Sequence, residues 1–365
     1  MIRVPVAVEP RPYEALIQSG LLSRAGAHLH EILRGPQCLF VVTVSRLRSK
    51  WAKTLLASLG AAGFAAKLVE MPDGEPHKRL ATIENLAEKL AKLGADRGAV
   101  ILALGGGVVG DVAGMLASLY MRGVDVIQVP TTLVAQVDAS VGGKTGVNLR
   151  AGKNLLGTFH QPRAVLVDPL VLSTLPRRQF QAGLYEALKC GVIGNPELFQ
   201  RFEDSKDKVL RRDEKILEQV IADSVQLKAQ IVATDERESG LRRVLNFGHT
   251  IGHALEAEGG YRGLLHGEAV AWGMIAATNI ALNVQRLDSV TAGRITDAVL
   301  GLGRLPRVSA RSSHILARLQ ADKKTKDGVV HFVLPTAIGK VEVVNDVQER
   351  VVLAAVDELR RLSKT

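Results

Sequence analysis

The segment AVILALGGGVVGD, residues 99–111, decides the fold class of this chain. Its first six residues are apolar, as in a strand buried on both faces, and they lead directly into three glycines and a helical pattern from Val112. Glycines allow the backbone to approach a pyrophosphate, and the first turn of a helix offers it unpaired N–H groups. Strand-to-helix turns without a ligand also use glycine, but the segment as a whole favours nucleotide binding.

Around this segment, the first half of the chain alternates short apolar runs with helical patterns such as residues 80–93. The alternation predicts a parallel sheet whose strands are joined by crossover helices. We expect strands at residues 39–44, 67–71, 99–104 and 124–129, and a first strand near the N-terminus at residues 1–6.

After Pro176 the sequence changes to helical periodicity with few strand signals. The pattern therefore predicts an α/β, Rossmann-like nucleotide-binding domain over residues 1–176 and a mostly α-helical domain over residues 177–365. Helices are expected at 177–193, 213–233, 250–258 and 268–287, followed by a hairpin of 329–334 and 340–344 around PTAIG and a last helix that ends near Leu362.

Composition excludes several classes of protein. With 47% hydrophobic and 23% charged residues in 365, the chain is globular, and its apolar runs are shorter than the ~20 residues that a membrane span requires. The N-terminus lacks the pattern of a secretory signal, and two isolated cysteines, Cys38 and Cys190, fit a reducing cytosol and argue against a thiolate zinc site. The net charge of +10 is spread without aromatic-rich basic stretches, so we expect an anionic small substrate rather than nucleic acid.

A second ligand-binding signal is VPTTLVAQVDASVGGKTGVN, residues 129–148. Thr131 and Thr132 end a predicted strand, which is where open parallel sheets bind ligands. Asp138 precedes Lys144 by six residues, and the two would also suit a structural ion pair. Loops that carry Gly-Gly-Lys-Thr more often hold phosphate or substrate, which favours a functional interpretation.

Histidines and a carboxylate predict a metal site in the second domain. His249 and His253, four apart in LNFGHTIGHALE, share a helix face, and LHGE adds His266. Imidazole and carboxylate form a zinc ligand set, and Glu186, three residues before Lys189, is a candidate for the carboxylate, although the two would also suit an ordinary surface pair. The spacing leaves open which two histidines bind the metal; if they are His249 and His266, His253 is available for proton transfer.

Cationic residues near these motifs suggest an anion pocket, although each alone would suit a solvated surface. They are Lys153, Lys228, Arg242, Arg243, Lys323 and Lys324, with Asn154 beside the first.

Taken together, the segments resemble 3-dehydroquinate synthase of the shikimate pathway over nearly the whole chain. The segments GGGVVGD, MRG, VPTTLVAQVDASVGGKTGVN, GKN, LNFGHTIGHALE, LHGE and DKK occur in this order at separations similar to those of the family. The resemblance implies a homodimer, bound NAD, and Zn²⁺ or Co²⁺. It also implies conversion of 3-deoxy-D-arabino-heptulosonate 7-phosphate to 3-dehydroquinate and phosphate, by transient oxidation, phosphate elimination, re-reduction and aldol closure.

The resemblance also implies roles for single residues. The implied metal ligands are Glu186, His249 and His266, and the implied catalytic residues are His253, Lys189, Asp138 and Glu186. The implied nucleotide contacts are Glu75 and Lys78 of GEPHK, Gly106, Gly107, Asp111, Thr131 and Thr132, with Asp138, Lys144 and Lys153. The implied substrate contacts are Lys144, Lys153, Asn154, Lys228, Arg242, Asn246 and Lys324, with Arg122 of MRG reaching a neighbouring subunit's site.

Two positions depart from the family pattern. Many members carry Asp or Asn after Thr at the end of the second strand, where this chain has Val44 after Thr43, so a ribose hydrogen bond is lost or made by Ser45. Tyr185 beside Glu186 is the second departure.

Three other functions share part of the pattern. A related cyclase acting on sedoheptulose 7-phosphate or glucose 6-phosphate would take a substrate without a carboxylate, whereas Arg242, Asn246 and His253 favour a substrate that has one. A glycerol-dehydrogenase-like oxidoreductase would share the glycine loop, but GGKTGVN and DKK argue against it. A non-enzymatic nucleotide-binding protein would keep the glycine loop but lose Glu186, His249 or Lys189, and this chain retains all three.

Overall fold

The chain forms two compact units in a computed structural model that describes residues 1–33, 37–238, 240–260, 263–325 and 330–364, with the backbone alone at 322–325. Unit 1 contains Met1–Leu175 and Leu217–Glu236, and unit 2 contains Pro176–Ile216 and Arg237–Thr365. The functional boundary between residues 176 and 177 stays a prediction.

A seven-stranded sheet forms the centre of unit 1, in the order β1-β2-β9-β6-β5-β3-β4 among the described residues. All neighbours are parallel except β1 and β2, which form an antiparallel pair at one edge. The strands are β1 (Ile2–Val6), β2 (Tyr13–Ile17), β3 (Leu39–Val44), β4 (Ala66–Met71), β5 (Val100–Gly105), β6 (Asp125–Pro130) and β9 (Ala164–Val167).

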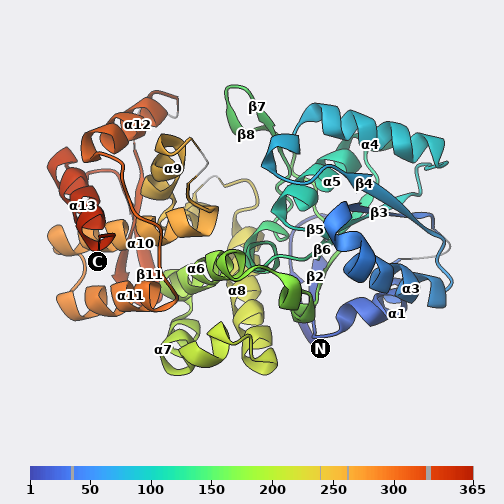
Figure 1. The fold of residues 1–365 in the computed structure, drawn as a ribbon, viewed down its shortest axis with the longest axis horizontal. Helices are drawn as coiled ribbons and strands as arrows, with labels where there is room; N and C mark the ends of the chain where they lie inside the picture. The colour runs from blue at the N-terminus through green and yellow to red at the C-terminus, as the bar shows by residue number, and fades with distance from the viewer. Residues whose placement is uncertain (34–36, 239, 261–262, 326–329, 365) are drawn as a thin grey trace. The chain divides into compact units, whose positions relative to one another are not determined.

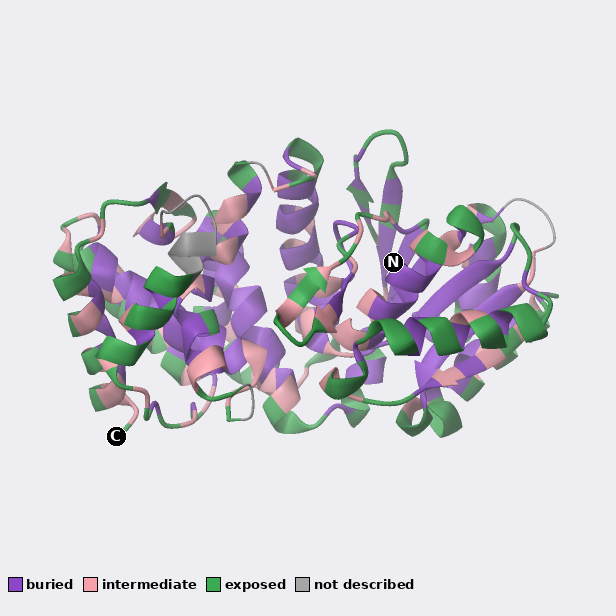
Figure 2. Cartoon of the chain, turned by 90° about the horizontal axis from the view of Figure 1, so that it is seen from above, coloured by how far each residue is buried: buried purple, intermediate pink, exposed green. Residues whose placement is uncertain are grey.

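Helices cover both faces of this sheet, which explains why its central strands are continuously apolar. All six residues of β3 and all six of β5 are buried, and Figure 2 shows this burial along the strands. Figure 1 shows α4 (Leu80–Lys92) and α5 (Gly107–Leu119) on one side of the strands, and α1 (Ala25–Ile32) and α3 (Lys53–Ala61) on the other. The predicted α/β class is confirmed, and the strands expected from 39 to 129 each lie within one residue of their predicted bounds.

Unit 2 is mainly helical, as predicted. Its helices are α6 (Arg177–Gly194), α7 (Pro196–Leu210), α9 (His249–Glu258), α10 (His266–Asn283), α11 (Ser289–Gly301), α12 (Ser312–Thr325) and α13 (Glu349–Leu362), while most of α8 (Glu214–Thr234) belongs to unit 1. Helix α10 is buried along most of its length, which explains its lack of an amphipathic pattern. No helix in the described part of the chain combines the length and apolar character needed to cross a membrane.

The predicted hairpin forms from β10 (Phe332–Ala337) and β11 (Lys340–Val344), but its turn is shorter than expected. Only Ile338 and Gly339 lie between the strands, and Gly339 has φ +82°, a left-handed conformation that suits glycine. Pro335 belongs to β10, where the register shifts towards Ala337. This small sheet tolerates a proline because a strand with one neighbour needs fewer backbone donors. The predicted start at residue 329 lies outside the described residues.

A buried carboxylate fastens the end of β9 to the N-terminal part of unit 1. Asp168 is 3% exposed, and its side chain accepts hydrogen bonds from the backbone N–H groups of Gly20, Leu22 and Leu170 at 2.8–2.9 Å. Three donors on one carboxylate satisfy backbone groups that have no ladder partner. Asp168 therefore joins segments almost 150 residues apart in the sequence.

Replacing this carboxylate should destabilise unit 1. Asp168→Ala leaves three partly or fully buried N–H groups without their acceptor, and we expect a loss of about 3 kcal/mol in the free energy of unfolding. Urea unfolding followed by the fluorescence of Trp51, which lies in unit 1, would measure it. Asp125→Ala, at a partly exposed carboxylate, is the control and should change the midpoint little. Equal midpoints for both variants would contradict the anchoring role.

Candidate active-site residues

The predicted nucleotide loop lies between β5 and α5 at the carboxyl edge of the parallel sheet. Gly106 is the N-cap of α5 and provides no side-chain hydrogen bond, so the first-turn N–H groups have no capping side chain. A Cβ on Gly106 would lie 2.9 Å from the Thr132 methyl group. The loop therefore packs against the end of β6 and leaves backbone donors for an anion.

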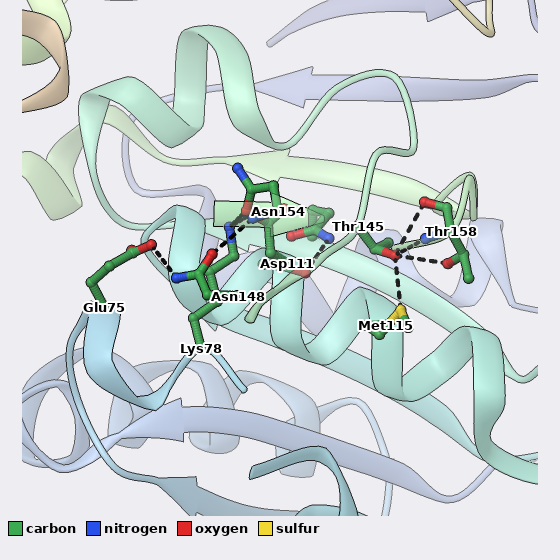
Figure 3. Close-up of polar contacts among 10 residues, drawn as sticks. Glu75, Lys78, Asp111, Met115, Thr145, Asn148, Asn154 and Thr158 are labelled. Atoms are coloured by element: carbon green, nitrogen blue, oxygen red, sulfur yellow. Dashed lines mark hydrogen bonds and ion pairs between the residues drawn. The ribbon is translucent and has the colours of Figure 1, made fainter. Parts of the chain in front are cut away.

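Beside this loop, a chain of polar contacts joins four segments of unit 1, as Figure 3 shows. Lys78 is 5% exposed and forms an ion pair with Asp111 of α5, and its Nζ donates to Asn154 Oδ1 at 2.5 Å. Asn148 Nδ2 donates to Glu75 Oε1 at 2.7 Å, and Asn148 Oδ1 accepts from the Asn154 N–H at 2.9 Å. Four of the predicted nucleotide and substrate residues thus lie in one network, with Asn148 between them.

This network fixes the small β7 (Val147–Leu149) and β8 (Gly152–Leu156) hairpin, which carries the predicted substrate residues Lys153 and Asn154. Asn154 has φ +55°, an uncommon conformation that its two hydrogen bonds stabilise. Burial raises the pKa of Asp111, and Lys78 opposes that shift. The carboxylate therefore depends on Lys78 for its charged form.

Hydroxyl contacts hold the Gly-Gly-Lys-Thr loop, and Figure 3 shows those that join Thr145 to Thr158. Thr145 Oγ1 and Thr158 Oγ1 lie 2.7 Å apart, and Thr158 Oγ1 donates to Ser118 Oγ at 2.9 Å. These bonds anchor the loop to α5, while Lys144, one residue earlier, is exposed. Lys144 therefore extends from a backbone that these bonds anchor.

Asp138 and Lys228, both predicted site residues, form an ion pair within unit 1. Lys228 Nζ lies 2.5 Å from Asp138 Oδ1 and also donates to the Asp138 carbonyl at 2.5 Å. Lys228 is 6% exposed and projects from α8, and Asp138 lies in the π-helical turn η5 (Ala135–Ala139) that follows the Thr131–Thr132 strand end. The structure thus pairs Asp138 with Lys228, a partner that the sequence analysis did not name.

In unit 2, three imidazoles and a carboxylate converge, as the sequence predicted. His249 and His253 of α9 and His266 of α10 place one ring nitrogen each within 4.8 Å of one another. Glu186 of α6 is 1% exposed, and its Oε1 lies 3.3 Å from His266 Nε2. Lys189, one turn along α6, is 2% exposed, and its Nζ lies 2.6 Å from Glu186 Oε2. All five candidate side chains therefore lie in one partly buried cluster.

The donor atoms of this cluster fit a divalent cation. Neither Glu186 oxygen has a hydrogen bond of good geometry among the described residues, although both have cationic or imidazole neighbours. His249 Nδ1 lies 3.1 Å from the Phe247 carbonyl and His266 Nδ1 lies 3.1 Å from Glu256 Oε2, so an N–H at each Nδ1 leaves Nε2 as the lone-pair donor. A buried carboxylate without hydrogen bonds beside such nitrogens suits a metal.

Electrostatics distinguish the two histidines. Burial, with the charge of Lys189, lowers the pKa of His249 well below its usual value, which keeps that imidazole neutral. Burial also lowers the pKa of His266, but the hydrogen bond to Glu256 and the charge of Glu186 outweigh it, so this pKa is raised. Glu186 and Glu256 both favour a proton on His266, and a bound metal cation would take the place of that proton.

The cluster depends on a close contact between α9 and α10. A Cβ on Gly273 would collide with the Gly248 carbonyl, and a Cβ on Gly252 would lie 2.8 Å from the Ala269 carbonyl oxygen. Gly248 itself has φ +80° as the N-cap of α9. Glycine is required where these backbones touch, and the contact brings His249 and His253 to the start of α10.

Family comparisons cover most of the chain. The 3-dehydroquinate synthase N-terminal model matches residues 68–182, and the 3-dehydroquinate synthase C-terminal model matches residues 183–325. The chain belongs to the 3-dehydroquinate synthase family. A 3-dehydroquinate synthase of Koribacter versatilis (strain Ellin345) is 54% identical over 363 residues, which is 100% of this chain and 99% of the relative. The resemblance inferred from the sequence motifs is therefore confirmed.

Solved structures similar to this member of the 3-dehydroquinate synthase family include other sugar phosphate cyclases. A 2-epi-5-epi-valiolone synthase from Streptomyces hygroscopicus subsp. jinggangensis 5008, with NAD⁺ and Zn²⁺ bound, has a TM-score of 0.87 and 32% identity over 98% of this chain and 99% of that one. A 2-deoxy-scyllo-inosose synthase complexed with carbaglucose-6-phosphate, NAD⁺ and Co²⁺ has a TM-score of 0.86 and 26% identity over the same shares. The fold is thus that of the cyclases.

The remaining predicted substrate residues differ in how far they are buried and in which groups they contact. In unit 2, Arg242 is 2% exposed and Asn246 Nδ2 donates to Glu238 Oε1 at 2.8 Å. In unit 1, Arg122 is exposed in η4 (Tyr120–Arg122) with φ +69°. The side chain of Lys324 lies outside the described residues.

The structure shows which groups surround the two positions that depart from the family pattern. The Tyr185 hydroxyl donates to the Gly303 carbonyl at 3.4 Å, and its ring is buried within unit 2. Thr43 is buried and its hydroxyl donates to the Leu104 carbonyl at 2.8 Å, while Ser45 is exposed at the start of α2 (Ser45–Leu47). A ribose contact by Ser45 stays a prediction.

Two residues with a clear structural role were not singled out from the sequence. Asn148 ends the quoted VPTT…GVN segment, and Glu256 ends LNFGHTIGHALE. Glu256 lies three residues after His253 and seven after His249, which is the spacing of one helix face. That spacing was the available signal for Glu256, whereas the contacts of Asn148 join residues up to 73 positions apart.

The glycine contact gives a test of how the histidines are assembled. Gly273→Ala should separate α9 from α10, lower the free energy of unfolding by about 1–3 kcal/mol and weaken zinc binding, because the histidines no longer converge. Circular dichroism during urea unfolding and a zinc titration would measure both effects. Gly293→Ala, at an exposed glycine within α11 with open space around it, is the matched control and should stabilise by roughly 0.5–1 kcal/mol. If Gly273→Ala behaves like the control, the contact does not assemble the site.

Proposed function

We propose that this chain is a 3-dehydroquinate synthase, a carbon–oxygen lyase that converts 3-deoxy-D-arabino-heptulosonate 7-phosphate to 3-dehydroquinate and phosphate. The observation that carries the proposal is the cluster of Glu186, Lys189 and three histidines in unit 2. Support comes from the full-length relative of that name at 54% identity, which exceeds the 32% and 26% identity to cyclases of other products.

We assign Glu186, His249 and His266 as the ligands of Zn²⁺ or Co²⁺. A carboxylate and two neutral imidazoles leave coordination positions open for substrate oxygens. The metal would polarise adjacent hydroxyl and carbonyl oxygens of the sugar. His253 is the exposed member of the triad, which suits a group that exchanges protons with substrate or water. Lys189 holds the Glu186 carboxylate and contributes positive charge to the same site.

We assign the nucleotide contacts to unit 1. The uncapped start of α5 at Gly106 and Gly107 would bind the pyrophosphate of NAD, and bound NAD would supply reversible oxidation at carbon 5. The remaining nucleotide contacts are Glu75, Lys78, Asp111, Thr131 and Thr132, with Asp138, Lys144 and Lys153 near the reacting end.

Cations that the sequence placed near these motifs would hold the carboxylate and phosphate of the substrate. Buried Lys228 and Arg242 suit charge-assisted hydrogen bonds, because desolvated cations bind oxyanions more strongly than exposed ones. We assign substrate contacts to Lys144, Lys153, Asn154, Lys228, Arg242, Asn246 and Lys324, with Arg122 serving the other subunit of a homodimer. Neither Cys38 nor Cys190 is in a disulfide, which is compatible with a cytoplasmic enzyme.

Measurements of metal binding can distinguish the assigned ligands from His253, the histidine that is not assigned as a ligand. Glu186→Gln should weaken zinc binding by more than the roughly 10- to 100-fold that loss of an outer-shell partner costs, because the ligand charge is lost. His253→Ala should retain the metal while activity falls. Metal content after dialysis against a chelator would measure the difference. Equal metal loss in both variants would show that the histidines are wrongly assigned.

Product analysis tests the reaction itself. Protein incubated with the heptulosonate phosphate and a small amount of NAD should release phosphate and form 3-dehydroquinate over many turnovers. The absorbance of NADH should stay flat, because the oxidation is reversed within each cycle. Growth of NADH without phosphate would indicate a dehydrogenase. Turnover of sedoheptulose 7-phosphate or glucose 6-phosphate in preference to the heptulosonate would indicate a related cyclase.

A further inference from the structure

The ring of His266 lies between two buried carboxylates. Its Nε2 is 3.3 Å from Glu186 Oε1, and its Nδ1 is 3.1 Å from Glu256 Oε2. Glu256 is 6% exposed and Glu186 is 1% exposed. One ring nitrogen therefore faces the ligand cluster, and the other faces a carboxylate outside it.

Glu256 reaches this position because of helix spacing. His249, His253 and Glu256 occur at positions i, i+4 and i+7 of α9, so all three lie along one face of the helix. The glycine contact between α9 and α10 brings that face against the first turn of α10, where His266 lies. The hydrogen bond thus spans two separate elements that close packing holds in place.

The other acid at the end of α9 has different surroundings. Glu258 lies two residues later, and its carboxylate binds His314 Nδ1 at 2.9 Å and Arg318 Nε at 2.6 Å. These are contacts on the outer part of unit 2, where all three side chains are partly exposed. The two glutamates share a helix and a chemistry, but only Glu256 contacts His266.

We propose that Glu256 is a positioning residue for the metal site, accepting the Nδ1–H of His266 so that Nε2 presents its lone pair towards the cation. A carboxylate acceptor fixes the tautomer and orientation of an imidazole and increases the basicity of its other nitrogen. Glu256 acts through His266 and is not itself a ligand. The inference rests on the metal site that the proposed function assigns.

The two simplest variants separate charge from geometry. Glu256→Gln keeps an oxygen that can accept a hydrogen bond from the His266 Nδ1–H but removes the negative charge. The imidazole of His266 should therefore keep its orientation while its Nε2 becomes less basic. Glu256→Ala removes both. We expect zinc affinity to decrease about 10- to 100-fold in Glu256→Ala and by a smaller factor in Glu256→Gln. Glu258→Gln, the matched control, should leave zinc affinity unchanged.

Zinc dissociation constants of the metal-free full-length proteins can be measured by competition with a chromophoric chelator. Cobalt-loaded proteins give a second measurement, because the visible absorption bands of Co²⁺ report ligand geometry independently of turnover. The bands should change in Glu256→Ala, remain close to those of the unmodified protein in Glu256→Gln, and be identical in Glu258→Gln. Thermal unfolding of the metal-free proteins would show whether a variant has lost stability in general, and so distinguish that effect from a specific loss of zinc affinity.

The order of affinities decides the proposal. Weaker zinc binding in Glu256→Ala with partial recovery in Glu256→Gln supports it. Zinc affinity and cobalt bands equal to those of Glu258→Gln overturn it, even where thermal stability falls. If Glu256→Ala does not fold, Glu256→Gln decides alone, and unaltered zinc affinity there overturns the proposal. Failure of the unmodified protein to bind zinc or cobalt would instead contradict the assigned metal site.

Discussion

The contact between α9 and α10 is the constraint on which the histidine cluster of unit 2 depends. The two helices approach so closely at Gly248, Gly252 and Gly273 that a Cβ on any of them would meet backbone of the other helix. No side chain separates the two backbones there, so the histidines of α9 meet the first turn of α10 directly. Larger residues would keep two well-formed helices but move their functional side chains apart.

In unit 1, polar contacts rather than glycine packing hold together the segments that carry candidate site residues. Lys78 and Asn148 join the loop after β4, the start of α5 and the β7–β8 hairpin. These segments are irregular or short, and packing of apolar surface alone would not define them. Buried and partly buried hydrogen bonds with charged members impose a particular geometry, because each unpaired group would be costly. The candidate nucleotide residues are therefore preorganised.

Both units place candidate site residues where burial and neighbouring charges shift their pKa values. Burial lowers the pKa of His249 and keeps its imidazole neutral, whereas two carboxylates raise the pKa of His266. Burial raises the pKa of Asp111 while Lys78 opposes the shift. In each case side chains on other elements contribute to the pKa shift. Side chains of the same type consequently differ in behaviour, which residue type alone does not indicate.

The sequence by itself determined the fold class, the central strands and the candidate histidines of the metal site, because hydrophobic periodicity and helix spacing are local properties. It identified β3 and β5, but missed β2 and β9, whose runs of five and four residues gain their definition from pairing with neighbours. Only the tertiary structure decided that Asp138 pairs with Lys228, that Asn148 joins Glu75 to Asn154, and that Glu256 contacts His266. These contacts depend on how separate elements pack, and packing brings together residues whose separation along the chain carries no periodic signal.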